Sequence, residues 1–87
     1  MHTPYLTTKN RITVEISQRN VDILTEHGEY IDDRDGKSTI HFKVPFRGTF
    51  VFVYDWKGQR RLTINPSGIR NQVTTAWAFI EHFKLDA

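Results

Sequence analysis

The sequence has 87 residues and contains no cysteine, which excludes disulfide bonds and thiolate metal sites. No window reaches about 18 consecutive apolar residues, so no segment is suited to span a membrane. The first ten residues also lack the apolar core of a secretory signal peptide. These absences lead us to expect a cytoplasmic protein that does not interact with membranes.

Motifs that identify common active sites are absent as well. There is no nucleophile elbow, no glycine-rich phosphate loop and no thiol. The four histidines show no paired spacing typical of a metal site. The stretch DDRDG resembles part of an EF-hand loop, but aligning Gly36 with the loop glycine puts Ile31 and Phe42 where carboxylates are required. We therefore expect neither an enzyme nor a bound metal or cofactor.

What the sequence does contain is the alternation of apolar and polar residues that is typical of β-strands. RITVEIS, at 11–17, alternates strictly and predicts a half-buried strand. Asp55 and Gly58 suit the first and fourth positions of a type I turn, which predicts a hairpin. Three further strands are predicted, at 39–46, 49–56 and 60–65.

The predicted strand TFVFVYDW is apolar on both faces, which is typical of a central strand. Phe50, Phe52 and Tyr54 share one face, and we expect most of these three rings to pack against a helix as core. The better candidates for exposed aromatic contacts lie near the turns, at Phe46 and Trp56.

Residues 19–31 are compatible with two structures. Asn20 could cap a short helix that runs to His27, with Gly28 just past its end. Equally, residues 21–25 could form a strand that turns at His27 and Gly28. The sequence slightly favours the strand.

The C-terminal segment has the apolar periodicity of a helix. At 100° per residue, its apolar side chains share one arc, namely Val73, Ala76, Trp77, Phe79, Ile80 and Phe83. Asn65 as N-cap and Pro66 at the first helical position predict where this helix begins. A break at Gly68 with a second start at Asn71 is the alternative.

These elements predict one α+β domain at 11–87, preceded by an N-terminal arm at 1–10. The domain would be an antiparallel sheet of four to five strands with one C-terminal helix packed across one face. The second face of the sheet would then meet solvent, meet a partner, or be closed by residues 1–10 and 19–31.

Charge is unevenly distributed along the chain. Residues 1–35 carry a net charge of −3 and residues 36–87 a net charge of +5. Within 37–70 there are seven cations and one anion. Such asymmetry favours an anionic partner for the basic part of the chain.

Aromatic residues are interleaved with these cations, a combination that favours nucleic-acid binding. Cations contact phosphates, and exposed rings stack on unpaired bases. RGTFVFVY resembles the RNP1 signature of RRM domains only in Arg47, Gly48 and Tyr54. We assign no RRM, because a hairpin and not a helix follows this strand.

The arrangement of strands, basic hairpin and C-terminal helix at 38–85 resembles, in outline, AP2 domains and the N-terminal domains of some phage integrases. Such domains place a sheet in the major groove of DNA. We expect a small non-enzymatic protein that binds DNA or RNA, with candidate residues Lys43, Arg47, Trp56, Lys57, Arg60, Arg61 and Arg70.

A protein partner is the alternative. The acidic and basic halves of this domain would suit a regulatory protein–protein interaction module or inhibitor of the kind that phages and mobile elements encode. If the strand at 11–17 lies at a sheet edge, it offers unpaired backbone groups to another chain. A homodimer is therefore a further expectation, in which the acidic stretch 22–35 would bind the basic stretch of a second copy.

Overall fold

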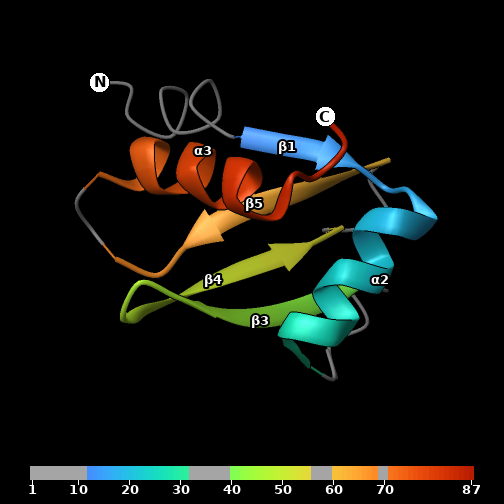
Figure 1. The fold of residues 1–87 in the computed structure, drawn as a ribbon, viewed down its shortest axis with the longest axis horizontal. Coiled ribbons are helices and arrows are strands. Elements are labelled where there is room, and N and C mark those ends of the chain that lie inside the picture. The colour runs from blue at the N-terminus through green and yellow to red at the C-terminus, as the bar shows by residue number, and fades with distance from the viewer. Residues whose placement is uncertain (1–11, 32–39, 56–59, 69–70) are drawn as a thin grey trace, which may run out of the picture.

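The computed structural model describes residues 12–31, 40–55, 60–68 and 71–87 (Figure 1). The predicted arm at 1–10 lies outside the described residues and stays a prediction. Of the predicted hairpin turn, only Asp55 is described.

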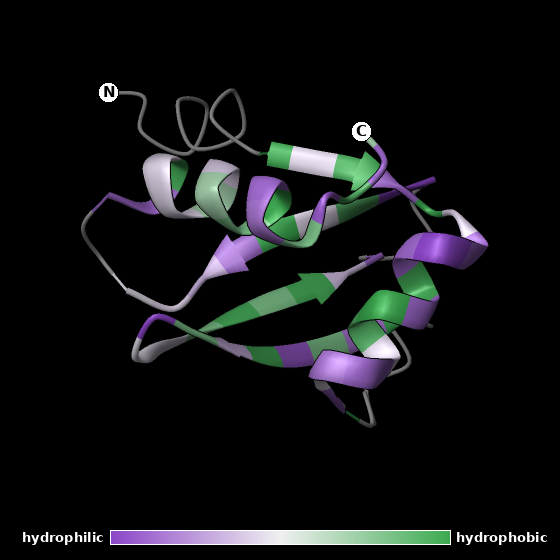
Figure 2. Ribbon diagram, viewed as in Figure 1, coloured by the Kyte–Doolittle hydropathy of each residue, from purple (hydrophilic) through white to green (hydrophobic). Residues whose placement is uncertain are grey.

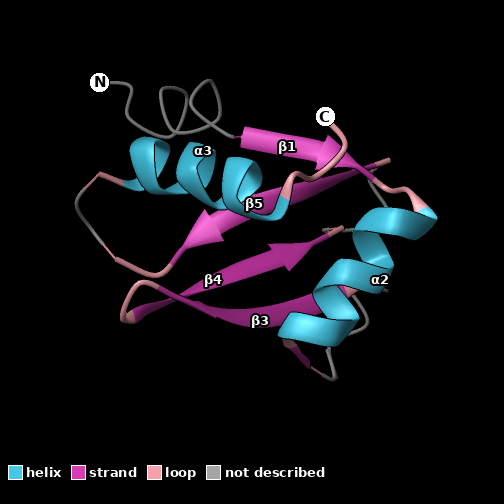
Figure 3. Ribbon diagram, viewed as in Figure 1, coloured by secondary structure: helices cyan, strands magenta, loops and turns pink. Residues whose placement is uncertain are grey.

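The described strands form one five-stranded antiparallel sheet with the spatial order β1-β5-β4-β3-β2 (Figure 3). This confirms the predicted α+β class. β4 is central, and β1 and β2 form the two edges of the sheet. The strands are β1 (Ile12–Glu15), β2 (Glu29–Tyr30), β3 (His41–Phe46), β4 (Thr49–Tyr54) and β5 (Arg61–Pro66).

A helix, α2 (Gln18–His27), occupies the segment for which the sequence slightly favoured a strand. That preference was wrong. Ser17, not Asn20, is the N-cap, since its Oγ accepts a hydrogen bond from the Asn20 N–H at 3.1 Å. Asn20 and Leu24 are the buried residues of this helix, one turn apart on the same side.

The C-terminal helix, α3 (Gln72–Phe83), begins after Asn71. The second of the two predicted starts is therefore correct, and the start at Asn65 and Pro66 was wrong because both residues belong to β5. At the other end, Lys84 is left-handed with φ 53°. Its N–H and that of Leu85 donate to carbonyls of the last turn, a Schellman motif.

Both helices lie on the same face of the sheet, α2 against β2 and β3, and α3 against β1 and β5 (Figure 1). Figure 2 shows apolar residues along β3 and β4 and on parts of both helices. They close one core that consists of Val14, Leu24, Phe42, Val44, Phe46, Val51, Val53, Leu62, Ile64, Ala76, Phe79, Ile80 and Leu85.

The face of β4 that enters this core is the opposite of the expected one. Val51 and Val53 are fully buried beneath the helices. Phe50, Phe52 and Tyr54 therefore point to the other side of the sheet, because successive side chains of a strand alternate between faces. The expectation that most of these rings pack against a helix was wrong.

Phe46 also differs from its prediction as an exposed aromatic residue. It is buried, and its ring meets that of Phe79 edge-on, with 5.4 Å between centroids. Val73 and Trp77, which lie at one margin of the apolar arc of α3, are instead 44% and 55% exposed.

None of the described helices is both long and apolar enough to cross a membrane.

Candidate binding face of the sheet

We define the outer face as the face of the sheet that is turned away from α2 and α3. A row of three aromatic side chains from the central strand β4 runs along it. Strand register fixes the neighbours of each ring. They are Lys43 and Asn65 beside Phe52, His41 and Thr63 beside Tyr54, and Pro45 beside Phe50.

The rings of this row are held by neighbouring side chains. The His41 ring lies edge-on to Tyr54 and Phe52, with centroid separations of 5.3 and 6.1 Å. Asn65 Nδ2 donates to the Tyr54 hydroxyl at 3.3 Å. The aromatic row is therefore fixed in place from both neighbouring strands.

Within the described part of the chain, the Nδ1 atom of His41 is buried and has no hydrogen-bond partner. Ring packing against Phe52 and Tyr54, and not a hydrogen bond at this atom, holds the imidazole in the row. The His41 imidazole thus adds a fourth ring, from β3, to the aromatic surface of the outer face.

Phe50 is the most accessible ring of the row, with 43% of its surface exposed. The ammonium of Lys43 lies 4.3 Å from its centroid, a cation–π contact. A cation and an exposed ring therefore stand side by side at this end of the row.

Arg61 is the second described cation on the outer face. Its Nε donates to Thr13 Oγ1 at 2.8 Å, and its Nη2 donates to the Thr13 carbonyl at 3.3 Å. Glu15 stands opposite Arg61 in the register, and Glu29 stands opposite Lys43. Both glutamates belong to the edge strands, whereas both cations flank the central strand.

The sequence-predicted candidates are therefore brought together only in part. Lys43 and Arg61 share the outer face, and Arg60 is exposed directly before β5. Arg47 lies in the β3–β4 turn with φ 52°, and its guanidinium covers the ring of Phe46, a residue of the helix side. The remaining candidates, Trp56, Lys57 and Arg70, lie outside the described residues.

Sequence reasoning missed the outward direction of Phe50, Phe52 and Tyr54, although the β3–β4 turn carried a usable signal. Both of its residues, Arg47 and Gly48, have positive φ, as a two-residue hairpin of type I′ requires. Such a turn pairs residue 46 with 49, and hence Lys43 with Phe52. This pairing puts the side chains of Phe50, Phe52 and Tyr54 on the same face of the sheet as the polar side chains of β3.

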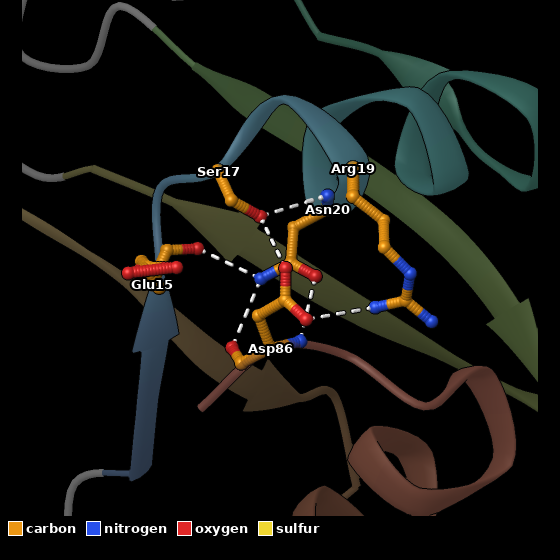
Figure 4. Close-up of polar contacts among 5 residues, drawn as sticks. All are labelled: Glu15, Ser17, Arg19, Asn20 and Asp86. Carbon is orange, nitrogen blue, oxygen red and sulfur yellow. Dashed lines mark hydrogen bonds and ion pairs between the residues drawn. The ribbon is translucent and has the colours of Figure 1, made fainter.

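A second cluster of polar residues surrounds Asp86 (Figure 4). Ser17 Oγ and Arg19 Nη1 donate to its carboxylate at 2.9 and 3.0 Å. Asn20 is fully buried and exchanges hydrogen bonds with the Asp86 backbone, while its Nδ2 also donates to the Glu15 carbonyl. These groups satisfy one another, so the cluster fastens the C-terminal segment to α2 and β1.

No group of three or more histidine, aspartate or glutamate side chains suited to a metal ion occurs among the described residues. No protein-family model, curated protein or solved structure matches this chain. The aromatic row and the cations on its neighbouring strands make the outer face the strongest candidate site on the described surface.

Proposed function

We propose that this protein binds nucleic acid through the outer face of its sheet and acts by binding, not by catalysis. The observation that carries the proposal is the row of Phe50, Phe52 and Tyr54, with Lys43 on one neighbouring strand and Arg61 on the other. Exposed rings stack on bases, and the adjacent cations contact phosphates.

The charge distribution supports the same proposal. The stretch 37–70 contains all of β3, β4 and β5 and carries a net charge of +6. A polyanion is attracted to such a segment before any specific contact forms. Lys57, Arg60 and Arg70 belong to the same stretch and remain candidates for phosphate contacts.

Titration of fluorescently labelled DNA and RNA at about 50 and 200 mM salt tests the proposal, because phosphate contacts weaken steeply over this range. We expect binding at the lower concentration that weakens at the higher one. Complete absence of binding to DNA and RNA at the lower concentration would refute the proposal.

The double variant Lys43→Gln with Arg61→Gln tests the location. It removes two positive charges from the outer face while it keeps long side chains, so we expect weaker binding. The control is Lys84→Gln at the end of α3, on the helix side of the sheet, which we expect to leave binding nearly unchanged. A loss for Lys84→Gln of half or more of the loss for the double variant, on a logarithmic scale of affinity, would indicate an effect of net charge and not of this face.

The alternative is a regulatory protein–protein interaction module or inhibitor, of the phage or mobile-element kind, that forms a homodimer. The exposed Val73 and Trp77 on α3 favour it. A hollow at the C-terminal end of α3 is lined by Trp77, Ala78, Ile80, Glu81, Lys84 and Leu85. Pairing through the β1 edge is less suited to this role, because the Glu15 N–H already donates to the Asp86 carbonyl at 3.2 Å.

Light scattering over a range of concentrations would detect self-association, and a protein that stays monomeric would exclude the dimer.

A further inference from the structure

We infer that the ligand of the outer face is single-stranded, and that its unpaired bases stack on the rings of β4. This inference rests on the proposed function and names its substrate class. It is supported by the positions of Phe50, Phe52 and Tyr54 on β4 and by the number and placement of the charges around them.

The spacing of the rings suits separate bases. They occupy alternate residues of one strand, so successive rings lie roughly 7 Å apart along β4. A duplex buries the faces of its bases and offers only their edges in the grooves. Unpaired bases expose their faces, and aromatic side chains stack on them whatever the sequence.

The described part of the outer face carries few charges for duplex binding. Its described cations are Lys43 and Arg61, and each faces a glutamate in the register. Duplex-binding proteins with steep salt dependence make about 6–10 phosphate contacts. These two described cations supply fewer contacts than that, so on the described part of this face stacking would provide most of the affinity.

The two cations stand near opposite ends of the ring row. The Lys43 ammonium lies 4.3 Å from the centroid of the Phe50 ring. Arg61 lies two residues before Thr63, the register partner of Tyr54. Phe50 and Tyr54, the outer rings of the row, are four residues apart. Four residues of a strand span roughly 14 Å. One extended strand that runs along β4 would therefore place a phosphate near each cation and its bases on the rings between them.

Polar groups beside the rings would meet the edges of stacked bases. Asn65 carries both amide donors and an acceptor, and its Nδ2 already reaches the Tyr54 hydroxyl. The Lys43 ammonium beside Phe50 is on a flexible stem, so it would contact the phosphate of a base on that ring.

The first experiment compares labelled single strands of about 12 nucleotides, as DNA and as RNA, with a duplex of the same sequence. We expect the single strands to bind more tightly. If Lys43 and Arg61 alone contact phosphates, the logarithm of the binding constant should fall with the logarithm of salt concentration with a slope of about −1.4, and contacts by Lys57, Arg60 and Arg70 as well would bring the slope to about −3.5. Comparison of the DNA strand with the RNA strand shows whether the face binds deoxyribose, ribose or both.

The second experiment removes the rings. Phe52→Leu and Tyr54→Leu keep apolar side chains on the strand, and each should weaken single-strand binding by about 5- to 150-fold, the usual range for one lost stacking contact. Trp77→Leu on α3 is the matched control, because it removes an exposed ring from the helix side. We expect unchanged affinity there. Circular dichroism and thermal unfolding verify that each variant is folded.

The possible failures are distinguishable. Duplex binding as tight as single-strand binding, with folded ring variants unaffected, would overturn the inference and leave nucleic-acid binding intact. A slope of about −4 or steeper would do the same, because it requires six or more single-strand phosphate contacts. Loss of all binding at low salt would overturn the proposed function itself.

Discussion

At the scale of single residues, Asn20 connects three parts of the chain. Its fully buried amide joins α2 to the Glu15 carbonyl at the end of β1 and to the backbone of Asp86 (Figure 4). A buried amide is stable only when its donors and acceptor are paired. All of these hydrogen bonds are to backbone groups, so the Asn20 side chain holds the backbone of Asp86 against the end of β1.

Replacement of Asn20 by alanine should lower the free energy of unfolding by about 2–3 kcal/mol, because backbone groups of Glu15 and Asp86 lose their partner while buried. Urea denaturation measures the change. Gln18→Ala is the control, since Gln18 makes an exposed hydrogen bond to Asp22. It should change stability by less than about 0.5 kcal/mol. Similar midpoints for the two variants would contradict the structural role of Asn20.

Gly28 is required for a different reason, the close approach of α2 to β3. A Cβ atom there would lie 2.7 Å from Val44 Cγ2 and 2.9 Å from the Leu24 carbonyl oxygen. Its φ of −126° is open to any residue, so the obstacle is steric. Gly28→Ala should therefore cost about 1–3 kcal/mol by overpacking.

The matched control is Gly68→Ala, where an added Cβ meets nothing within 4 Å. Thermal unfolding should show a lower midpoint for the Gly28 variant and little change for the Gly68 variant. A similar decrease in both variants would contradict the steric role of the contact with Val44.

At the scale of elements, the regular periodic segments could be predicted and the short or capped ones could not. β3 was predicted from alternation, β4 from a run that is apolar on both faces, and α3 from its apolar arc. α2 was missed because the capping residue is Ser17, three residues before the residue considered, and because ten residues with two buried positions give weak periodicity. The start of α3 was ambiguous since Asn65–Pro66 and Asn71 both suit a helix start, and only the pairing of β5 with β4 decides between them.

The end of α3 contains a replaceable strained residue. Lys84 adopts a left-handed conformation, with φ 53°, which costs a residue with a side chain about 1–2 kcal/mol relative to glycine. Lys84→Gly should therefore raise the free energy of unfolding by about 1 kcal/mol. Lys84→Ala removes the charge but keeps the strain, so chemical denaturation should show no such gain. Equal stabilisation by both variants would attribute the effect to charge.

At the scale of the whole molecule, the sheet separates two groups of aromatic residues with different roles. Phe79 is fully buried on the helix side and packs against Phe46 and Phe83. Phe50, on the outer face, is 43% exposed. The same residue type therefore stabilises the fold on one side and is available to a ligand on the other.

This separation predicts opposite outcomes for the same substitution. A chain of 87 residues has a free energy of unfolding of about 4–13 kcal/mol, and Phe79→Ala should remove about 3–5 kcal/mol of it. Phe50→Ala should lower stability by only about 1 kcal/mol or less yet weaken single-strand binding. Urea denaturation and nucleic-acid titration on the same two proteins measure both effects. If Phe50→Ala instead unfolded the chain as readily as Phe79→Ala, the outer rings would be part of the core and the binding face would lose its physical basis.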